Sequence, residues 1–260
     1  MSQISVRHLT KVFDGPTPAA QVVALDNVSC EIPEGEFLCI IGPSGCGKST
    51  LLHAIAGFVQ GSSGEALQDG RKIVAPGPDR IVMFQEYGLF PWLTVAENVE
   101  FGLLAKGVPA AERKETVQRY LQLVKLEGFE QRLPHQLSGG MKQRVSIARA
   151  LAPDPAVILM DEPFAALDSL TRDILQEEIL RIWEKTRKTF VLITHNIEEA
   201  VFLGDRVIVM TARPGRIKAQ IEVNIPRPRD PSIRSHHPRF LEIKDQLSQL
   251  LRTEITRDVA

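Results

Sequence analysis

Residues 42–50 have the sequence GPSGCGKST, whose glycines, lysine and hydroxyl side chains are suited to binding a chain of phosphate groups. The apolar segment FLCII precedes them and the helical segment LLHAIAGF follows. Glycines in such a turn let backbone N–H groups point at phosphate oxygens, and the helix that follows adds its positive N-terminal end. The segment therefore predicts a nucleoside triphosphate site. Its expected members are Gly42, Pro43, Ser44, Gly45, Cys46, Gly47, Lys48, Ser49 and Thr50.

Two side chains of this loop have separate expected roles. Lys48 can reach the β- and γ-phosphates with its ammonium group, and the Ser49 hydroxyl can bind Mg²⁺. The loop alone does not specify the reaction, because kinases, GTPases and motor ATPases share it.

A pair of carboxylates stands in the segment VILMDEPFAALD, directly after an apolar run. Asp161 and Glu162 are expected at the same edge of a parallel sheet as the phosphate loop, because parallel strands deliver their carboxyl ends to one edge. Asp161 would hold Mg²⁺ through water. Glu162 would orient the water that attacks the γ-phosphate or accept its proton.

The segment LSGGMKQR, residues 137–144, opens a predicted helix with Ser138 as its N-cap. It lies shortly before VILMDEP, and in this place it resembles the signature motif of the ABC ATPase family. In that family the motif forms a second anion site for the γ-phosphate held by the phosphate loop of another subunit. The resemblance implies nucleotide contacts in trans from Ser138, Gly139 and Gly140, and a head-to-tail dimer of two copies. Met141 departs from the family pattern, which more often has glutamine there.

Further positions match the same family one by one, over residues 4 to 225. Gln85 resembles the glutamine that reaches Mg²⁺ and the attacking water, and Asp168 resembles the D-loop acid that crosses the dimer interface. His195 resembles the switch histidine that contacts the γ-phosphate and steadies Glu162. Phe13 resembles the aromatic residue that stacks on adenine, with a place in a small core as the alternative. The resemblance thus implies catalytic roles for Glu162, His195, Gln85 and Lys48, a contact in trans from Asp168, and Mg²⁺ ligands Ser49, Gln85 and Asp161.

The elements that must position these residues follow from apolar runs bounded by turn residues. Buried strands are predicted at residues 37–41, 80–84, 157–160, 190–193 and 207–210. Their alternation with helical stretches favours a mostly parallel sheet covered by helices. Residues 1–35 have short strand-like pieces joined by the turn-rich segment DGPTPAAQ, which indicates an antiparallel β edge.

Residues 94 to about 152 contain helical patterns and no convincing strand. Helices are predicted at 95–106, 110–126 and 138–151, forming a helical subdomain inserted into the sheet domain. The predicted fold class is therefore α/β, with a P-loop NTPase (RecA-like) core, an antiparallel β edge and an inserted helical subdomain.

The last part of the chain differs in composition. The segment IPRPRDPSIRSHHPR is rich in proline and arginine, and a helical pattern follows it. Phe240, Ile243, Leu247 and Leu250 fall on one face of that helix. We predict an ABC ATPase domain at 1–225, followed at 226–260 by a linker and an amphipathic helix docked on the domain; contact of the arginines with a membrane surface is the alternative.

Composition and charge exclude several classes of protein. A net charge of -1 leaves no basic excess for binding nucleic acid over a long surface. Neither a membrane span nor a signal peptide is evident in the sequence. Cys30, Cys39 and Cys46 are too widely spaced to suggest a disulfide framework or a zinc site, which favours a reducing cytoplasm. A cysteine at position 46 is common in the ABC family, where it contributes its backbone, so its thiol is expected to be open to modification.

The segments QEYGLFPWLTVAENVEFGL and MTARPGRI are similar to importer ATPases that serve nitrate, sulfonate and taurine uptake. In importers, residues corresponding to 87–92 form a groove for a short helix of a membrane subunit; ordinary core packing is the alternative. The resemblance implies import of a small solute driven by ATP with Mg²⁺, at the cytoplasmic face of the plasma (inner) membrane. The implied partners are two membrane-spanning permease subunits and a solute-binding protein, with no nucleic acid.

Two other functions stay open beside the importer. One is the ATPase of an ABC exporter, and the other is a soluble ABC ATPase that acts on nucleic acid or ribosomes. The solute stays unassigned, because its selectivity lies in the partner subunits.

Overall fold

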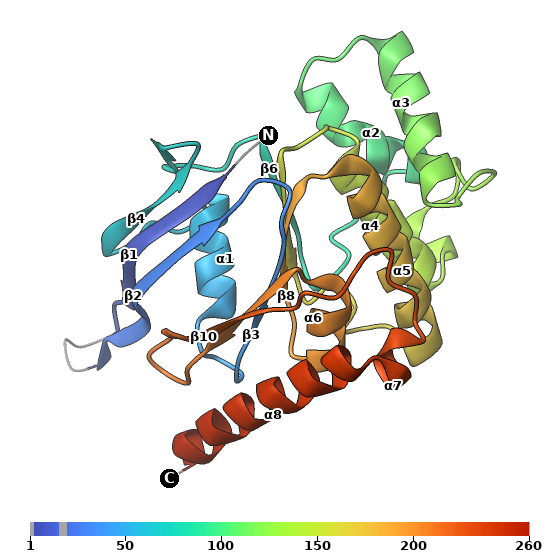
Figure 1. The fold of residues 1–260 in the computed structure, drawn as a ribbon. Coiled ribbons are helices and arrows are strands. Elements are labelled where there is room, and N and C mark those ends of the chain that lie inside the picture. Colours follow the sequence, from blue (N-terminus) through green and yellow to red (C-terminus); the bar gives the residue numbers. More distant parts are fainter. Residues whose placement is uncertain (1–2, 16–19, 260) are drawn as a thin grey trace.

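The structure is a computed structural model that describes residues 3–15 and 20–259 (Figure 1). Two β-sheets lie on either side of helix α1 (Lys48–Ala56), and further helices cover the other face of the larger sheet. Residues 16–19 of the predicted turn-rich loop lie outside the described residues. The α/β fold with an antiparallel β edge and an inserted helical subdomain is confirmed.

The larger sheet has the strand that leads to the phosphate loop near its centre. Its order is β10 (Ile217–Glu222), β9 (Arg206–Met210), β3 (Phe37–Ile41), β8 (Thr189–Ile193), β7 (Val157–Asp161) and β6 (Arg80–Met83). All neighbours are parallel except β10, which runs antiparallel to β9. The five predicted strands are confirmed to within one residue at each end. Every residue of β3 and β8 is buried, which explains their uninterrupted apolar sequences.

The smaller sheet is antiparallel and brings the N-terminal strands over α1. Its order is β2 (Val22–Ile32), β1 (Ile4–Phe13), β4 (Ser63–Gln68) and β5 (Arg71–Lys72). Leu51 and Ile55 of α1 are fully buried in one core cluster with Ile4 of β1 and Ile40 of β3. One helix thus joins the two sheets through a shared apolar core.

Between β6 and β7 the chain forms the predicted helical subdomain, with no strand among its described residues. Its elements are α2 (Val95–Ala105), α3 (Ala110–Leu123), the 3-10 helix η2 (Pro134–Gln136) and α4 (Gly139–Leu151). Helix α2 begins at a capping box, in which the Thr94 hydroxyl accepts the N–H of Glu97 and the Glu97 carboxylate accepts the N–H of Thr94. Ser138 caps α4, as predicted.

The remaining helices cover the larger sheet on the side away from α1 (Figure 1). They are α5 (Ser169–Thr186), α6 (Ile197–Leu203), α7 (Ile233–His236) and α8 (Pro238–Val259). The predicted apolar face of α8 is turned inward, since Phe240, Ile243 and Leu247 are fully buried and Leu250 is partly buried. The boundary at residues 225 and 226 stays a prediction. In the described part of the chain, every helix is too short or too polar to cross a bilayer.

The burial of Phe240 leads to a prediction about stability. We expect Phe240→Ala to lower the free energy of unfolding by about 3–5 kcal/mol, because a buried ring is replaced by a cavity. Urea denaturation followed by circular dichroism measures this change. Leu241→Ala is the matched control: Leu241 is 40% exposed, and we expect a change of less than about 0.5 kcal/mol. Equal losses in the two variants would contradict the docking of α8 through the Phe240 face.

Candidate nucleotide-binding site

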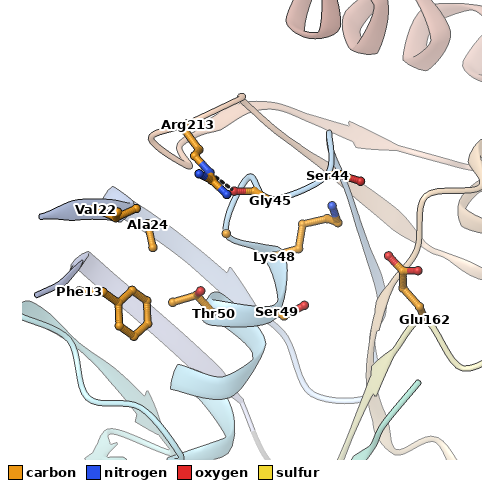
Figure 2. A pocket seen from close by; sticks show the side chains of 11 residues that line it. Phe13, Val22, Ala24, Ser44, Gly45, Lys48, Ser49, Thr50, Glu162 and Arg213 are labelled. Carbon is orange, nitrogen blue, oxygen red and sulfur yellow. Dashed lines mark hydrogen bonds between the residues drawn. The ribbon is translucent and has the colours of Figure 1, made fainter. Parts of the chain in front are cut away.

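A pocket of about 340 Å³ lies where the loop between β3 and α1 meets the antiparallel sheet (Figure 2). It is lined by Phe13, Val22, Ala24, Ser44, Gly45, Gly47, Lys48, Ser49, Thr50, Glu162 and Arg213. Figure 2 shows Phe13, Val22 and Ala24 at one end of the pocket and Glu162 at the other, with Lys48 between them. An apolar end and a charged end thus share one cavity, which suits a molecule with an aromatic ring and a polyanionic chain.

The phosphate loop has a turn that requires glycine at two positions. Gly45 and Gly47 have φ angles of 69° and 97°, in the left-handed region. A Cβ atom on Gly47 would stand 2.5 Å from the carbonyl oxygen of Ala24, so β2 leaves no room for a side chain there. Gly47 is also the N-cap of α1, whose first N–H groups therefore open toward the loop. These features fit a phosphate chain at the start of the helix.

Lys48 places a cation inside this loop. Its side chain is buried, and Nζ donates to the carbonyl oxygens of Gly42 at 2.9 Å and Pro43 at 2.8 Å. A desolvated ammonium group beside a helix N-terminus attracts a polyanion strongly, because little water screens its charge.

Asp161 and Ser49 meet beside the loop, at the end of β7 and the start of α1. The Ser49 hydroxyl donates to Oδ1 of Asp161 at 3.2 Å. Burial raises the pKa of the Asp161 carboxyl above its ordinary value, and the Ser49 hydrogen bond opposes that shift. The described residues form no cluster of three or more histidine, cysteine or acidic ligands. A hydroxyl and one carboxylate nevertheless fit Mg²⁺, which binds through few protein ligands together with substrate phosphates.

Glu162 is held in a sparsely populated backbone conformation at the charged end of the pocket. Its φ angle is 46°, and its N–H donates to the carbonyl oxygen of Ile193 in β8 at 3.0 Å. The Nδ1 atom of His195, just beyond β8, lies 3.1 Å from Oε2 of Glu162. A strained residue held by a neighbouring strand is a feature of functional sites, and here it aims a carboxylate into the pocket.

Phe13 lies at the apolar end and is 43% exposed. The Lys11 ammonium lies 5.0 Å from the centre of its ring. The alternative that placed Phe13 in a small core is wrong.

Val22 and Ala24 are lining residues that were not expected from the sequence. They lie beside Phe13 because Phe13 pairs with Val22 where strands β1 and β2 run antiparallel. The sequence did hold a signal for these two residues: they begin the next strand after Phe13, and that strand pairs with the strand of Phe13.

Arg213 is a further lining residue that sequence reasoning missed. It belongs to the turn between β9 and β10, and its Nε donates to the carbonyl oxygen of Gly45 at 2.9 Å (Figure 2). No spacing rule connects residues 45 and 213, because the contact arises from the pairing of β3 with β9.

The signature residues, Asp168 and Gln85 are not among the residues that line the pocket. The Ser138 hydroxyl accepts the N–H of Met141 at the start of α4, at 3.3 Å. Asp168 begins α5 in the same way, and the hydrogen bond from the Thr171 N–H lowers the pKa of its carboxyl. Gln85 is exposed and lies just beyond β6. The roles expected of these residues, including those of Gly139 and Gly140 in trans, stay predictions.

The Cys46 thiol differs from the expectation that it is open to modification. Its side chain is only 1% exposed and turns toward Gly42, where a Cβ atom would stand 2.7 Å from the sulfur. Burial raises the pKa of the thiol, although nearby Lys48 opposes this. The expectation is wrong because the loop turns this side chain inward, and Cys46 is not among the residues that line the pocket.

The chain is similar in sequence and in structure to ATP-binding proteins of ABC transporters. A family model described as ABC transporter matches residues 25–165. A nitrate import ATP-binding protein from Synechocystis sp. is 45% identical over 265 residues, covering 99% of this chain and 99% of that protein. A taurine import ATP-binding protein from Roseobacter denitrificans is 48% identical over 217 residues, covering 84% and 81%. The dimeric structure of a bacterial ABC transporter cassette has a TM-score of 0.75 and 36% identity, covering 86% of this chain and 100% of that chain.

The burial of the cysteines predicts low thiol reactivity. Burial raises the pKa of Cys30 to about 12 and the pKa values of Cys39 and Cys46 above the ordinary value, so little thiolate is present near neutral pH. We expect the native protein to react slowly with a chromogenic disulfide reagent at pH 8, and the urea-unfolded protein to react quickly at all three thiols. Native labelling of Cys46 as fast as in urea would contradict its inward orientation.

Proposed function

Because the chain belongs to the ABC transporter family of ATP-binding proteins, we propose that it is the ATP-hydrolysing subunit of an importer for a small solute of the nitrate, sulfonate and taurine class. The observation that carries this proposal is that three residues line the same pocket. They are the exposed ring of Phe13, the buried Lys48 in a glycine loop, and Glu162, whose carboxylate contacts His195. The nitrate and taurine importer relatives support the solute class.

In the proposed reaction, water attacks the γ-phosphate in line with the bond that breaks. Glu162 orients this water and accepts its proton, while His195 holds the carboxylate in place. Lys48 stabilises the negative charge on the transferring phosphoryl group. Ser49, Asp161 and Gln85 would hold Mg²⁺, which when bound neutralises charge on the phosphate oxygens.

We assign the second half of the site to another copy of the chain. Ser138 is exposed and Gly140 is half-buried at the start of α4, and Asp168 is exposed at the start of α5. Free N–H groups at such helix starts attract anions, so the signature of one copy would contact ATP in the loop of the other. The dimeric arrangement of the related cassette supports a head-to-tail dimer. A monomer would then hydrolyse ATP weakly.

An apolar groove offers a site for the membrane subunit. Its cavity measures about 330 Å³, and Phe84, Phe90, Phe101, Gly88 and Pro153 are among its lining residues. Nearby Trp92 is 72% exposed. Exposed aromatic clusters of this kind are typical of protein interfaces. We propose that each of two permease subunits inserts a short helix here, that a solute-binding protein completes the system, and that the chain sits at the cytoplasmic face of the membrane.

Glu162→Gln tests the catalytic assignment. We expect Mg-ATP hydrolysis to fall at least about 100-fold, because the amide cannot accept the proton of water. The variant is also expected to accumulate as an ATP-bound dimer, which size-exclusion chromatography with light scattering detects. Glu198→Gln, which changes a carboxylate that pairs with Lys244 at the surface, is the control and is expected to keep the wild-type rate. Wild-type hydrolysis by Glu162→Gln would overturn the role given to Glu162.

The groove leads to a second prediction. We expect Phe101→Asp to prevent stable assembly with the membrane subunits, because it places a charge in an apolar contact. Co-purification of the tagged chain with its co-expressed permease measures assembly. The matched control is Leu241→Asp, which makes the same kind of change at an exposed apolar residue on α8. Equal recovery of the permease by Phe101→Asp and the wild type would contradict the proposed docking site.

A further inference from the structure

The turn between β9 and β10, residues 211–216, reaches from the larger sheet to the phosphate loop (Figure 2). Its Arg213 side chain lines the nucleotide pocket and adds a positive charge beside that of Lys48. We propose that Arg213 is a positioning residue for ATP, and that helix α8 sets the position of Arg213 through Glu254. This inference rests on ATP occupying the pocket, as in the proposed function.

The hydrogen bond from Arg213 orients one peptide group of the loop. The C=O and N–H of a trans peptide point in opposite directions, so holding the Gly45 oxygen toward Arg213 turns the Cys46 N–H to the other side. There it donates to the carbonyl oxygen of Pro43 at 3.4 Å, and the same oxygen accepts a hydrogen bond from Lys48 Nζ at 2.8 Å. Arg213 therefore stabilises the closed turn of the loop, in which one carbonyl oxygen, that of Pro43, accepts both this N–H and the Lys48 ammonium that lines the pocket.

The turn is itself fixed against β2. The Gly215 N–H donates to the carbonyl oxygen of Ala24 at 3.1 Å, and the Gly215 oxygen accepts the N–H of Asp26 at 3.0 Å. Arg216 Nε donates to the Asp26 carboxylate at 2.8 Å. A Cβ atom on Gly215 would stand 2.1 Å from the carbonyl oxygen of Cys46. The turn and the phosphate loop are in direct contact, so a displacement of the turn must also move the loop.

Glu254 connects this turn to α8 and is only 2% exposed. One carboxylate oxygen accepts the N–H of Ala212, next to Arg213, at 3.0 Å, and the other lies 2.7 Å from Nζ of Lys218 in β10. Lys218 also donates to the carbonyl oxygen of Leu250 in α8 at 2.9 Å. Charge-assisted bonds in a buried place are strong, and removal of one partner leaves a buried charge. The end of α8 thus holds both the start of the turn and the strand that follows it.

Binding of a fluorescent ATP analogue with Mg²⁺ to the full chain tests the proposal. We expect Arg213→Ala to weaken binding about tenfold, or ~1.4 kcal/mol, and Arg213→Lys to restore part of the loss. Glu254→Ala should weaken binding about three- to tenfold, although Glu254 is not among the residues that line the pocket. Because Glu254 acts through Arg213, the double variant should bind no more weakly than Arg213→Ala alone. Lys244→Ala removes another α8 ion pair and should stay within about twofold of the wild type.

Hydrogen–deuterium exchange without nucleotide gives an independent readout. The amides of residues 43–47 should exchange faster in Arg213→Ala and in Glu254→Ala than in the wild type, and at the wild-type rate in Lys244→Ala. Thermal unfolding checks that each variant is folded. If Glu254→Ala fails to fold, Glu254→Gln provides the test: it loses the charge-assisted contact with Lys218, so weaker binding and faster exchange than in the wild type are expected, both smaller than in Arg213→Ala.

Three results would overturn the inference. Wild-type affinity and exchange in Arg213→Ala would remove the role of Arg213, and wild-type values in the folded Glu254 variant would remove the role of α8. Additive losses in the double variant would show that Glu254 acts by another route. Lys48→Ala separates these failures from failure of the nucleotide site: if it keeps wild-type affinity, the site assignment is wrong.

Discussion

The packing of the phosphate loop against β2 is the constraint on which the nucleotide site depends. No side chain fits between Gly47 and the Ala24 carbonyl, and Leu51 in the next helix is fully buried between the two sheets. A side chain at position 47 would therefore push the loop away from β2. The same packing brings Phe13, on the antiparallel sheet, to one cavity with Lys48, on α1. Phe13 at one end of the pocket belongs to the smaller sheet, and Glu162 at the other end follows β7 of the larger sheet. The core that the two sheets share around α1 fixes the distance between these ends.

Features with a local signal could be predicted from the sequence, and contacts set by strand pairing could not. The FLCII run is uniformly apolar because β3 is buried on both faces, and the glycine loop follows it directly. Arg213 enters the pocket because Ile41 pairs with Val209 in the parallel sheet, which brings the segments after β3 and β9 to one edge. The expected exposure of the Cys46 thiol was wrong for a related reason. The thiol is buried beside the Lys48 ammonium only once the loop has folded, and no local sequence pattern indicates this.

Ser138 and Asp168 each begin a helix by accepting one backbone N–H, and the first N–H groups of a helix have no partner within the helix itself. These two helix starts lie close together, since a Cβ atom on Gly140 of α4 would stand 2.6 Å from a methyl carbon of Thr171 in α5. Their dipoles therefore add at one place on the surface. In the proposed dimer, the side chains that begin these two helices in the monomer would therefore also lie beside a partner's phosphates.

The segment of residues 87–90, beside the apolar groove, contacts helix α4 near both of its ends. Arg149 of α4 donates to the carbonyl oxygens of Gly88 at 2.6 Å and Tyr87 at 3.1 Å, and its guanidinium lies over the Phe90 ring. The Tyr87 hydroxyl is so near Gly139 that a Cβ atom there would stand 2.9 Å from it. In the proposed assembly, a helix in the groove would press on a segment that also contacts Gly139 of the signature motif, and would displace the two together. The phosphate loop is held separately, by α1 and the two sheets. In the proposed dimer, a partner in the groove would thus alter ATP hydrolysis by moving one chain's signature relative to the other chain's loop, without reshaping the loop itself.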